Sequence, residues 1–259
     1  MPKRLVTRIV IDVNKGGRKT NAKRQPAGMH TQMVKFKSEQ AHADIAFTPR
    51  RVIIAGYTGR DQAAVRAHIN ELAAQGVPPP PEVPAILHVT LDRLTSDSEV
   101  QVLGPDTSGE AEVVLLVNGP EIWVAVGSDH TDRALERISI GASKQVCPKP
   151  VSAEVWSYAH VREQWDSLIL RSWVGETGRE KLYQEGRLSQ VLSPTDLLVH
   201  LRSRLGQLVD CAVIYTGTIP LAAGRFVTKP YFEAELLDEA TGRSLHCVYR
   251  AQRADPTLR

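Results

Sequence analysis

The chain has 259 residues, of which 42% are hydrophobic and 5% are aromatic. No stretch is apolar for long enough to cross a bilayer, and the low aromatic content argues against a platform on which nucleic-acid bases stack. This composition favours a mixed α and β enzyme scaffold, with neither a membrane nor a nucleic acid as its partner.

The net charge of +3 comes from the N-terminal tail. Up to His30 the chain holds eight Lys or Arg and one acidic residue, Asp12. Removing these from the 32 basic and 29 acidic residues leaves 24 and 28, so the remainder is about four units negative. We expect residues 1–32 to be a disordered basic tail or the result of a start assigned too far upstream. Residues 33–259 are expected to form a single catalytic domain.

The cysteines indicate a compartment rather than a site. There are three, Cys147, Cys211 and Cys247, and they are widely separated. Their spacing does not match that of cysteine metal ligands. A reducing, cytoplasmic location therefore fits the chain best.

Strands outnumber helices in the expected secondary structure. Apolar and β-branched runs bounded by turn residues predict strands at residues 34–36, 45–47, 51–55, 85–89, 99–103, 112–117, 122–126, 212–215, 231–237 and 245–249. A helix is expected at residues 62–75, where apolar side chains recur at helical spacing and Gly76 follows. Another is expected at residues 194–205, with Ser193 as its N-cap and Pro194 in its first position.

Three further segments are expected to be short or irregular. A short helix is expected near Asp132, followed by a loop that carries Lys144 and Lys149. Tyr183 is expected in a strand that ends at a turn formed by residues 185–186.

Three carboxylates are expected to meet at one point. Glu110 and Glu112 are two apart at the start of a predicted strand, so both side chains leave the same face. Residues 118–120, Asn-Gly-Pro, can connect this strand to the next one, and Asp129 falls just past the end of that second strand. Neighbouring like charges need a cation, and three carboxylates with room for water suit a hard divalent ion such as Mg, Mn or Ca.

Each of these charged residues also has an ordinary explanation. A Glu-x-Glu pair on a strand can be the solvated face of a half-buried sheet, and Asp129 can cap a turn or a helix. Arg133 and Lys144 can pair with surface acids. What favours an ion site is the presence of further matching residues elsewhere in the chain.

Two more groups of residues can carry chemistry. His68 and Glu71 are three apart on a predicted helix, so the carboxylate can orient the imidazole as a base that activates water. Pairs of this kind are also common on helix surfaces. Residues 214–220 predict a strand that ends in a Thr-Gly-Thr loop, whose hydroxyls and backbone amides can bind an anion, although most such loops are simple turns.

Taken in their order along the chain, these motifs resemble the fumarylacetoacetate hydrolase superfamily. Its members show a Tyr-containing turn and a His-x-x-Glu helix, matched here by Gly56-Tyr57 and His68-Ile-Asn-Glu71. A Glu-x-Glu strand, an Asp-x-x-x-Arg segment, a lysine loop and Thr-Gly-Thr then follow, matched by Glu110, Glu112, Asp129, Arg133, Lys144 and Thr216-Gly-Thr218. The similarity covers roughly residues 51–249, and more specifically the chain resembles a bacterial branch of unknown function with a Gly-Ser-Asp-His-Thr-Asp-Arg signature.

The resemblance implies a β-rich α+β fold, in which mixed, mainly antiparallel sheets form a β-roll or sandwich with a few flanking helices. It implies a homodimer and a small-molecule acid as substrate. It also implies a divalent metal, Mg first with Mn or Ca as alternatives, held by Glu110, Glu112 and Asp129. The catalytic residues that it implies are His68, Glu71 and Lys144, and the substrate-binding residues are Tyr57, Arg133, Gly217 and Thr218.

The reaction that the resemblance implies is hydrolysis of a carbon–carbon bond in a small 2-oxo or 1,3-dicarbonyl acid. The metal would stabilise the enolate that is released, and His68, oriented by Glu71, would activate the attacking water. A decarboxylase, hydratase or isomerase of the same superfamily and a non-catalytic ligand-binding or scaffold protein are the alternatives, and a nucleic-acid-binding tail is the most distant one. Departures from the superfamily pattern at His88, Glu136 and Ile219 lie where the substrate would be selected.

Overall fold

The computed structural model describes residues 34–38, 43–74, 78–177 and 180–254. The expected tail at residues 1–32 lies outside these residues, and the assignment of residues 33–259 to one domain stays a prediction. In the described part of the chain, strands outnumber helices, so the predicted β-rich α+β class is confirmed.

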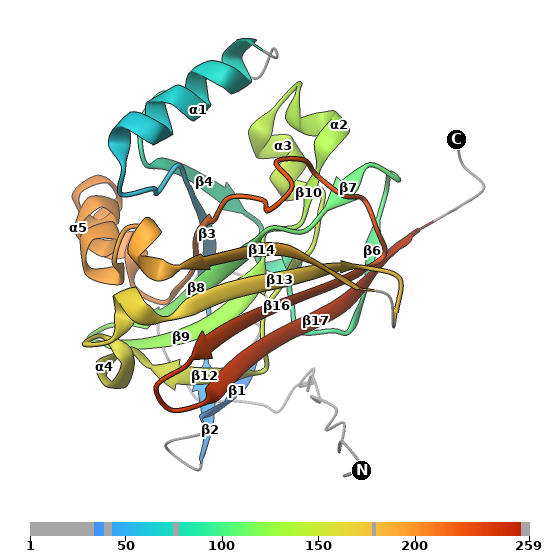
Figure 1. The fold of residues 1–259 in the computed structure, drawn as a ribbon. Helices are drawn as coiled ribbons and strands as arrows, with labels where there is room; N and C mark the ends of the chain where they lie inside the picture. Colours follow the sequence, from blue (N-terminus) through green and yellow to red (C-terminus); the bar gives the residue numbers. More distant parts are fainter. Residues whose placement is uncertain (1–33, 39–42, 75–77, 178–179, 255–259) are drawn as a thin grey trace, which may run out of the picture.

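The larger sheet has eight strands within the described residues. They are β1 (Val34–Ser38), β2 (Ala43–Phe47), β3 (Arg51–Gly56), β4 (Ala85–Val89), β8 (Ala111–Asn118), β9 (Glu121–Ser128), β12 (Glu154–Ser157) and β15 (Ala212–Thr218). Their spatial order is β2-β1-β12-β9-β8-β15-β3-β4 (Figure 1). Most neighbouring pairs are antiparallel, and β1 with β12 and β3 with β15 are the parallel exceptions among them.

The second sheet has five strands in the same described part. They are β6 (Glu99–Val102), β13 (Ile169–Gly175), β14 (Lys181–Arg187), β16 (Tyr231–Asp238) and β17 (Arg243–Arg253), in the spatial order β14-β13-β16-β17-β6. Four short strands form two further pairs: β5 (Leu94–Thr95) with β11 (Lys149–Pro150), and β7 (Thr107–Ser108) with β10 (Thr131–Asp132). The predicted arrangement of mixed, mainly antiparallel sheets is therefore confirmed.

The helices of the described chain are few and lie outside the sheets (Figure 1). The α-helices are α1 (Gln62–Ala74), α2 (Arg133–Glu136), α3 (Ile140–Gln145), α4 (Tyr158–Val161) and α5 (Pro194–Leu205), and the 3-10 helices are η1 (Leu91–Arg93), η2 (Trp165–Ser167), η3 (Leu188–Gln190) and η4 (Gly206–Val209). Among the described helices, none is both long enough and apolar enough to serve as a membrane span.

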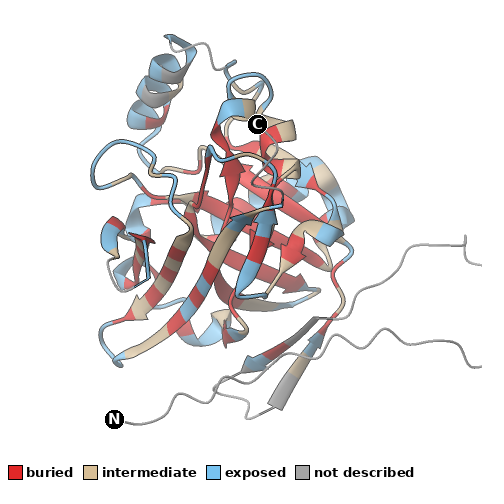
Figure 2. Ribbon diagram, turned by 90° about the vertical axis from the view of Figure 1, so that its right-hand side faces the viewer, coloured by how far each residue is buried: buried red, intermediate tan, exposed pale blue. Residues whose placement is uncertain are grey.

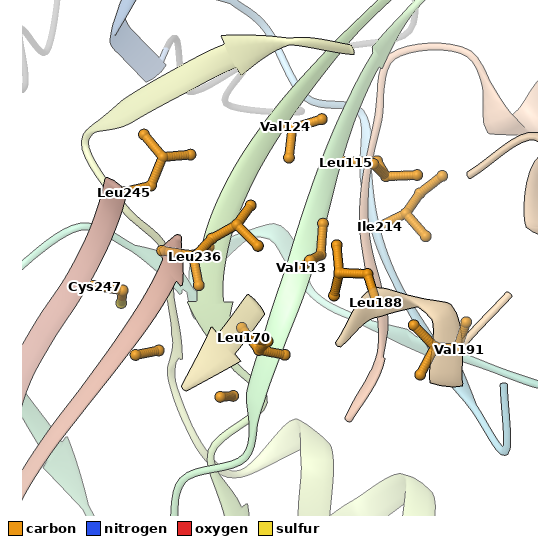
Figure 3. Close-up of a cluster of buried hydrophobic side chains, with 14 of the residues drawn as sticks. Val113, Leu115, Val124, Leu170, Leu188, Val191, Ile214, Leu236, Leu245 and Cys247 are labelled. Carbon is orange, nitrogen blue, oxygen red and sulfur yellow. The ribbon is translucent and has the colours of Figure 1, made fainter. Parts of the chain in front are cut away.

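Both faces of the larger sheet are buried at its centre. In β8, Val113 and Leu115 belong to one apolar cluster while Val114 and Leu116 belong to another, because alternate side chains of a strand point to opposite faces. The first cluster fills the space between the two sheets, and Figure 3 shows side chains of β8 and β9 facing those of the second sheet, among them Leu170, Leu236 and Leu245. Figure 2 shows the resulting buried interior and the more exposed periphery.

All ten expected strands are present, and helix α5 has the expected bounds with Ser193 as its cap, since Ser193 Oγ accepts from the Asp196 amide. Three local expectations are wrong. Lys144 lies on α3 rather than in a loop, because Ser139 Oγ accepts from Ala142 N and caps a new helix. Residues 185–186 lie inside β14, because both of them pair with β13 and continue the strand. The Thr-Gly-Thr segment extends β15 through a bulge instead of leaving it as a loop.

Candidate metal centre

Glu110, Glu112 and Asp129 converge through the hairpin of β8 and β9. Glu112 lies opposite Gly127 in the ladder, and the Asp129 amide donates to the Glu110 carbonyl at 3.0 Å. One carboxylate oxygen from each residue lies within 4.8 Å of the other two. Glu110 directly precedes β8 and Glu112 lies within it, so their two-residue spacing and the pairing of β8 with β9 produce the convergence that the sequence predicts.

The three carboxylates are held in different electrostatic environments. Glu112 is 2% exposed, and burial, with Asp129 and Glu110 beside it, raises the pKa of its carboxyl well above the usual range. Burial also acts to raise the pKa of Glu110, but Arg133 and Lys144 outweigh it and lower this pKa to about 2. The cluster therefore contains one stabilised carboxylate and one that is under strain from its like-charged neighbours.

Lys144 projects from α3 between two of these carboxylates. Its ammonium lies 2.8 Å from Glu110 Oε2 and 2.6 Å from Asp129 Oδ2, and it donates to Thr131 Oγ1 at 2.9 Å. Burial acts to lower the pKa of Lys144, yet Asp129 and Glu110 raise it overall, so the side chain stays charged. A lysine that the sequence proposes as catalytic is thus in direct contact with the carboxylate cluster.

Lys149 approaches Asp129 from the other side, and sequence reasoning did not select it. Its side chain is fully buried, and its ammonium lies 3.2 Å from Asp129 Oδ1 and donates to the carbonyls of His130 and Cys147 at 2.7 Å and 3.2 Å. Burial lowers the pKa of Lys149 despite the attraction of Asp129. The sequence offered one hint of this role: Lys149 lies between two prolines and before Val151. A lysine that is buried in such a segment needs a partner for its charge.

Arg133 is engaged by the protein on every side. Its Nη2 lies 3.3 Å from Glu110 Oε1, its Nη1 lies 2.8 Å from Glu136 Oε2, and its Nε donates to Ser108 Oγ at 2.7 Å. The Phe226 ring covers the guanidinium, with its centroid 3.7 Å from Cζ. The geometry places Arg133 behind Glu110 as a support for a carboxylate of the cluster.

The donor set of the cluster suits a hard cation. Both oxygens of Asp129 are buried, and each is ion-paired with one lysine, Oδ2 with Lys144 at 2.6 Å and Oδ1 with Lys149 at 3.2 Å. Carboxylate oxygens on three converging side chains are the ligands that hard divalent ions take. The triad of Glu110, Glu112 and Asp129 could therefore hold a metal ion.

Gly217 and Thr218 contact the strand that carries the triad. The Gly217 amide donates to Glu112 Oε2 at 2.9 Å, and its φ of +91 suits glycine, since a Cβ there would lie 2.1 Å from Thr58 Oγ1. Thr218 Oγ1 donates its proton to the Ala111 carbonyl and accepts from Gln184 Nε2, both at 2.8 Å. These two residues support Glu112 and its strand, and the Thr218 hydroxyl proton is already used within the protein.

Tyr57 lies in the turn before α1 and faces the charged cluster. Its φ of +57 is uncommon for a residue with a side chain. Burial raises the pKa of its phenol, and Glu136 adds to the effect while Lys144 opposes it. Tyr57 is therefore a protonated phenol within electrostatic range of Glu136 and Lys144.

His68 and Glu71 lie on α1, as predicted. The side chain of His68 is outside the described part of the structure, and Glu71 is exposed. In the view of Figure 1, α1 lies at the upper left, above β3 and β4, whereas β17 and β6 of the second sheet lie toward the lower right. The catalytic pairing of His68 with the carboxylate cluster stays a prediction.

A family model described as a protein of unknown function (DUF2848) matches residues 55–249. No match was found among curated proteins.

Among solved structures, a 2-keto-3-deoxyarabinonate dehydratase is similar over 80% of this chain and 75% of its own, with 13% identity and a TM-score of 0.58. A protein from Yersinia pestis CO92 assigned to the fumarylacetoacetate hydrolase family is similar over 85% of this chain and 100% of its own, with 15% identity and a TM-score of 0.57. The 2-keto-3-deoxy-D-arabinonate dehydratase complexed with magnesium and 2,5-dioxopentanoate has 13% identity and a TM-score of 0.56, over 81% of this chain and 76% of its own. The fold is thus that of fumarylacetoacetate hydrolase family proteins, as the motif order predicts.

Proposed function

We propose, from the premise that the chain belongs to the DUF2848 family of unknown function, that it is a metal-dependent enzyme acting on a small 2-oxo or 1,3-dicarbonyl acid. The observation that carries this proposal is the triad of Glu110, Glu112 and Asp129, in which the last two are buried and one oxygen from each residue lies within 4.8 Å of the other two. Lys144, Lys149 and Arg133 pair with Glu110 and Asp129, but burial and its like-charged neighbours still raise the pKa of Glu112, and a further cation among the three carboxylates would relieve this repulsion. A carbon–carbon hydrolysis is the reaction that we place first.

The proposed cation is Mg, with Mn or Ca as alternatives. Carboxylate ligands and room for water suit all three ions. The structurally similar dehydratase complexed with magnesium and 2,5-dioxopentanoate supports this choice, since its ligand combines carbonyl and carboxylate oxygens. When bound, such an ion supplies Lewis-acid stabilisation of negative charge that develops on oxygens of the substrate.

The protein's own residues would divide the remaining work. The Lys144 ammonium, 2.8 Å from Glu110 and 2.6 Å from Asp129, would offset negative charge on the reacting oxygen. Arg133 would hold Glu110 in place. Tyr57 would donate a hydrogen bond to the substrate, since its raised pKa keeps the phenol protonated.

In the hydrolysis, the oxygen of water bonds to the distal carbonyl carbon. The bond from that carbon to the neighbouring methylene carbon breaks, and its electron pair ends in a new C–H bond. His68, oriented by Glu71, would take a proton from the attacking water and deliver it to the methylene carbon that leaves. This role depends on α1 bringing His68 to the substrate.

A dehydration is the second candidate, and the name of the similar dehydratase favours it. Elimination of water from a 2-oxo acid develops negative charge on the same oxygens but needs no attacking water. In that case His68 and Glu71 would only move a proton. We also expect a homodimer in the cytoplasm, which sedimentation analysis and fractionation can test.

The metal proposal is tested by thermal stability in the presence of Mg or Mn with oxalate, which chelates such ions. At a concentration of 100 times Kd, a ligand raises the free energy of unfolding by ~2.7 kcal/mol. Glu110→Gln should abolish this gain, whereas Glu163→Gln, an exposed matched control, should keep it. A wild-type protein that gains no stability from either ion with oxalate would contradict the metal proposal.

The reaction is tested by incubation with a panel of acylpyruvates, oxaloacetate and 2-keto-3-deoxy sugar acids. Hydrolysis predicts two carbon fragments from an acylpyruvate, and dehydration predicts loss of water from a sugar acid. His68→Ala should lower hydrolytic turnover by 100-fold or more, the usual range for a general base being about 10²–10⁴. Equal turnover in the variant would remove His68 from this role.

A further inference from the structure

The charges around the triad nearly balance. Four carboxylates meet three cations: Glu110, Glu112, Asp129 and Glu136 on one side, and Lys144, Lys149 and Arg133 on the other. With all four carboxylates ionised, as metal ligation requires of the triad, one negative charge is in excess. A divalent ion would turn this into one positive charge, so a single negative charge on the substrate completes the balance.

Each of the three cations already has carboxylate partners. Lys144 contacts Glu110 and Asp129, Lys149 contacts Asp129, and Arg133 lies between Glu110 and Glu136. The face of Arg133 is covered by Phe226 as well. A second carboxylate on the substrate would therefore have to displace an existing ion pair.

Glu136 marks the exposed side of the cluster. Its side chain is 21% exposed, against 1% for Asp129, and its two oxygens lie 2.8 Å from Arg133 Nη1 and 4.0 Å from Lys144 Nζ. The Tyr57 phenol lies close enough for Glu136 to raise its pKa. Phe226, 45% exposed, adds an apolar ring beside Arg133. The groups on this side of the cluster are thus a carboxylate, a phenol and an aromatic ring.

We propose that the substrate is a monocarboxylic 2-oxo acid whose far end is uncharged and donates a hydrogen bond, and that Glu136 rejects a second carboxylate at that end. A carboxylate brought close to Glu136 would meet like charge, whereas an amide or hydroxyl would donate to it. This inference rests on the proposed function, and it assigns specificity to a residue outside the triad.

The test uses two ligands of nearly equal shape. 2-Oxoglutarate carries a second carboxylate at its far end, and its 5-methyl ester carries a neutral group there. Calorimetric titration of each into the Mg-loaded protein gives two Kd values. We expect the ester to bind at least tenfold more tightly to the wild type, and we expect Glu136→Gln to reduce or reverse this preference because it removes the charge.

A purely structural role for Glu136 would weaken both ligands by a similar factor and leave their ratio unchanged, and that result overturns the proposal. Equal affinity for the two ligands in the wild type overturns it as well, as does binding of neither ligand while oxalate still stabilises the protein. If Glu136→Gln fails to fold, the same titrations are made with Glu136→Ala. Glu163→Gln is the matched control and should keep the wild-type ratio of the two Kd values. Loss of the oxalate and metal response in the wild type would instead reject the proposed function.

Discussion

The carboxylate cluster and helix α1 differ in how firmly the rest of the protein holds them. At the cluster, Glu112 and Asp129 are buried and contact backbone or charged groups from β15, α3 and β11. On α1, Val65 is the buried side chain among those that the structure describes. The carboxylates are therefore positioned by a hairpin and its neighbours, while the expected water-activating residues stand on an element whose described side chains are mostly exposed.

This difference suggests a division of labour. A metal centre needs its ligands held before the ion arrives, because every ligand that must be ordered on binding lowers affinity. An element that takes part only once substrate is present can be drawn from the less stable parts of a fold. Four measurements can break or sharpen the comparison between the cluster and α1.

The largest effect is expected at Lys149. Lys149→Ala removes a fully buried ammonium from Asp129 and leaves two carbonyls, those of His130 and Cys147, without this donor. Breaking a buried pair costs about 3–5 kcal/mol when the remaining charge is left unpaired, and we expect the lower end of this range because Lys144 still contacts Asp129. Urea unfolding should show this loss of unfolding free energy, and a loss below about 1 kcal/mol would mean that Lys149 does not hold the cluster together.

Gly217→Ala comes next. Its φ of +91 makes alanine strained there, and the added Cβ would be crowded because it would lie 2.1 Å from Thr58 Oγ1. Gly119→Ala is the matched control, since its φ is +61 but nothing lies within 4 Å of the place that its Cβ would take. We expect a loss of about 1–3 kcal/mol in the first variant and a smaller loss in the control. Equal losses would show that the contact with Thr58 does not constrain the Glu112 support.

The pH dependence of the metal-free protein should depend on Glu112. Its pKa in the folded state is raised, so its contribution to stability is present below the ordinary value of 4.5 and is lost as the pH rises toward the folded-state pKa. Glu112→Gln should therefore flatten the fall of melting temperature above pH 4.5. An unchanged slope in the variant would show that Glu112 is not held in a destabilised ionised form.

The smallest effect is expected on α1. Ala67 is exposed, so Ala67→Gly removes no packing and costs at most about 1 kcal/mol of helix propensity. Hydrogen exchange should show faster opening of α1, while the Kd for Mg with oxalate stays unchanged. A weaker Kd in this variant would mean that α1 and the cluster are coupled, contrary to the comparison.

Local patterns were sufficient to predict the framework of the cluster. The β8–β9 hairpin follows from apolar runs joined by a short turn, and the two-residue spacing of Glu110 and Glu112 places both on one face. The N-cap of α5 could be read from Ser193 and Pro194 for the same reason. In these cases the deciding interactions lie between residues close together in the chain.

The partners of the cluster were decided by the tertiary structure alone. Lys144 reaches Glu110 across 34 positions, and Gly217 reaches Glu112 across 105 positions. The contacts of Lys149 with Asp129 and of Phe226 with the Arg133 guanidinium depend on how separate segments pack, whereas Glu136 pairs with Arg133 within α2. The sequence by itself therefore determined where three carboxylates converge, because strand alternation and turn geometry are local. Which cations contact them depended on long-range packing that no local pattern encodes.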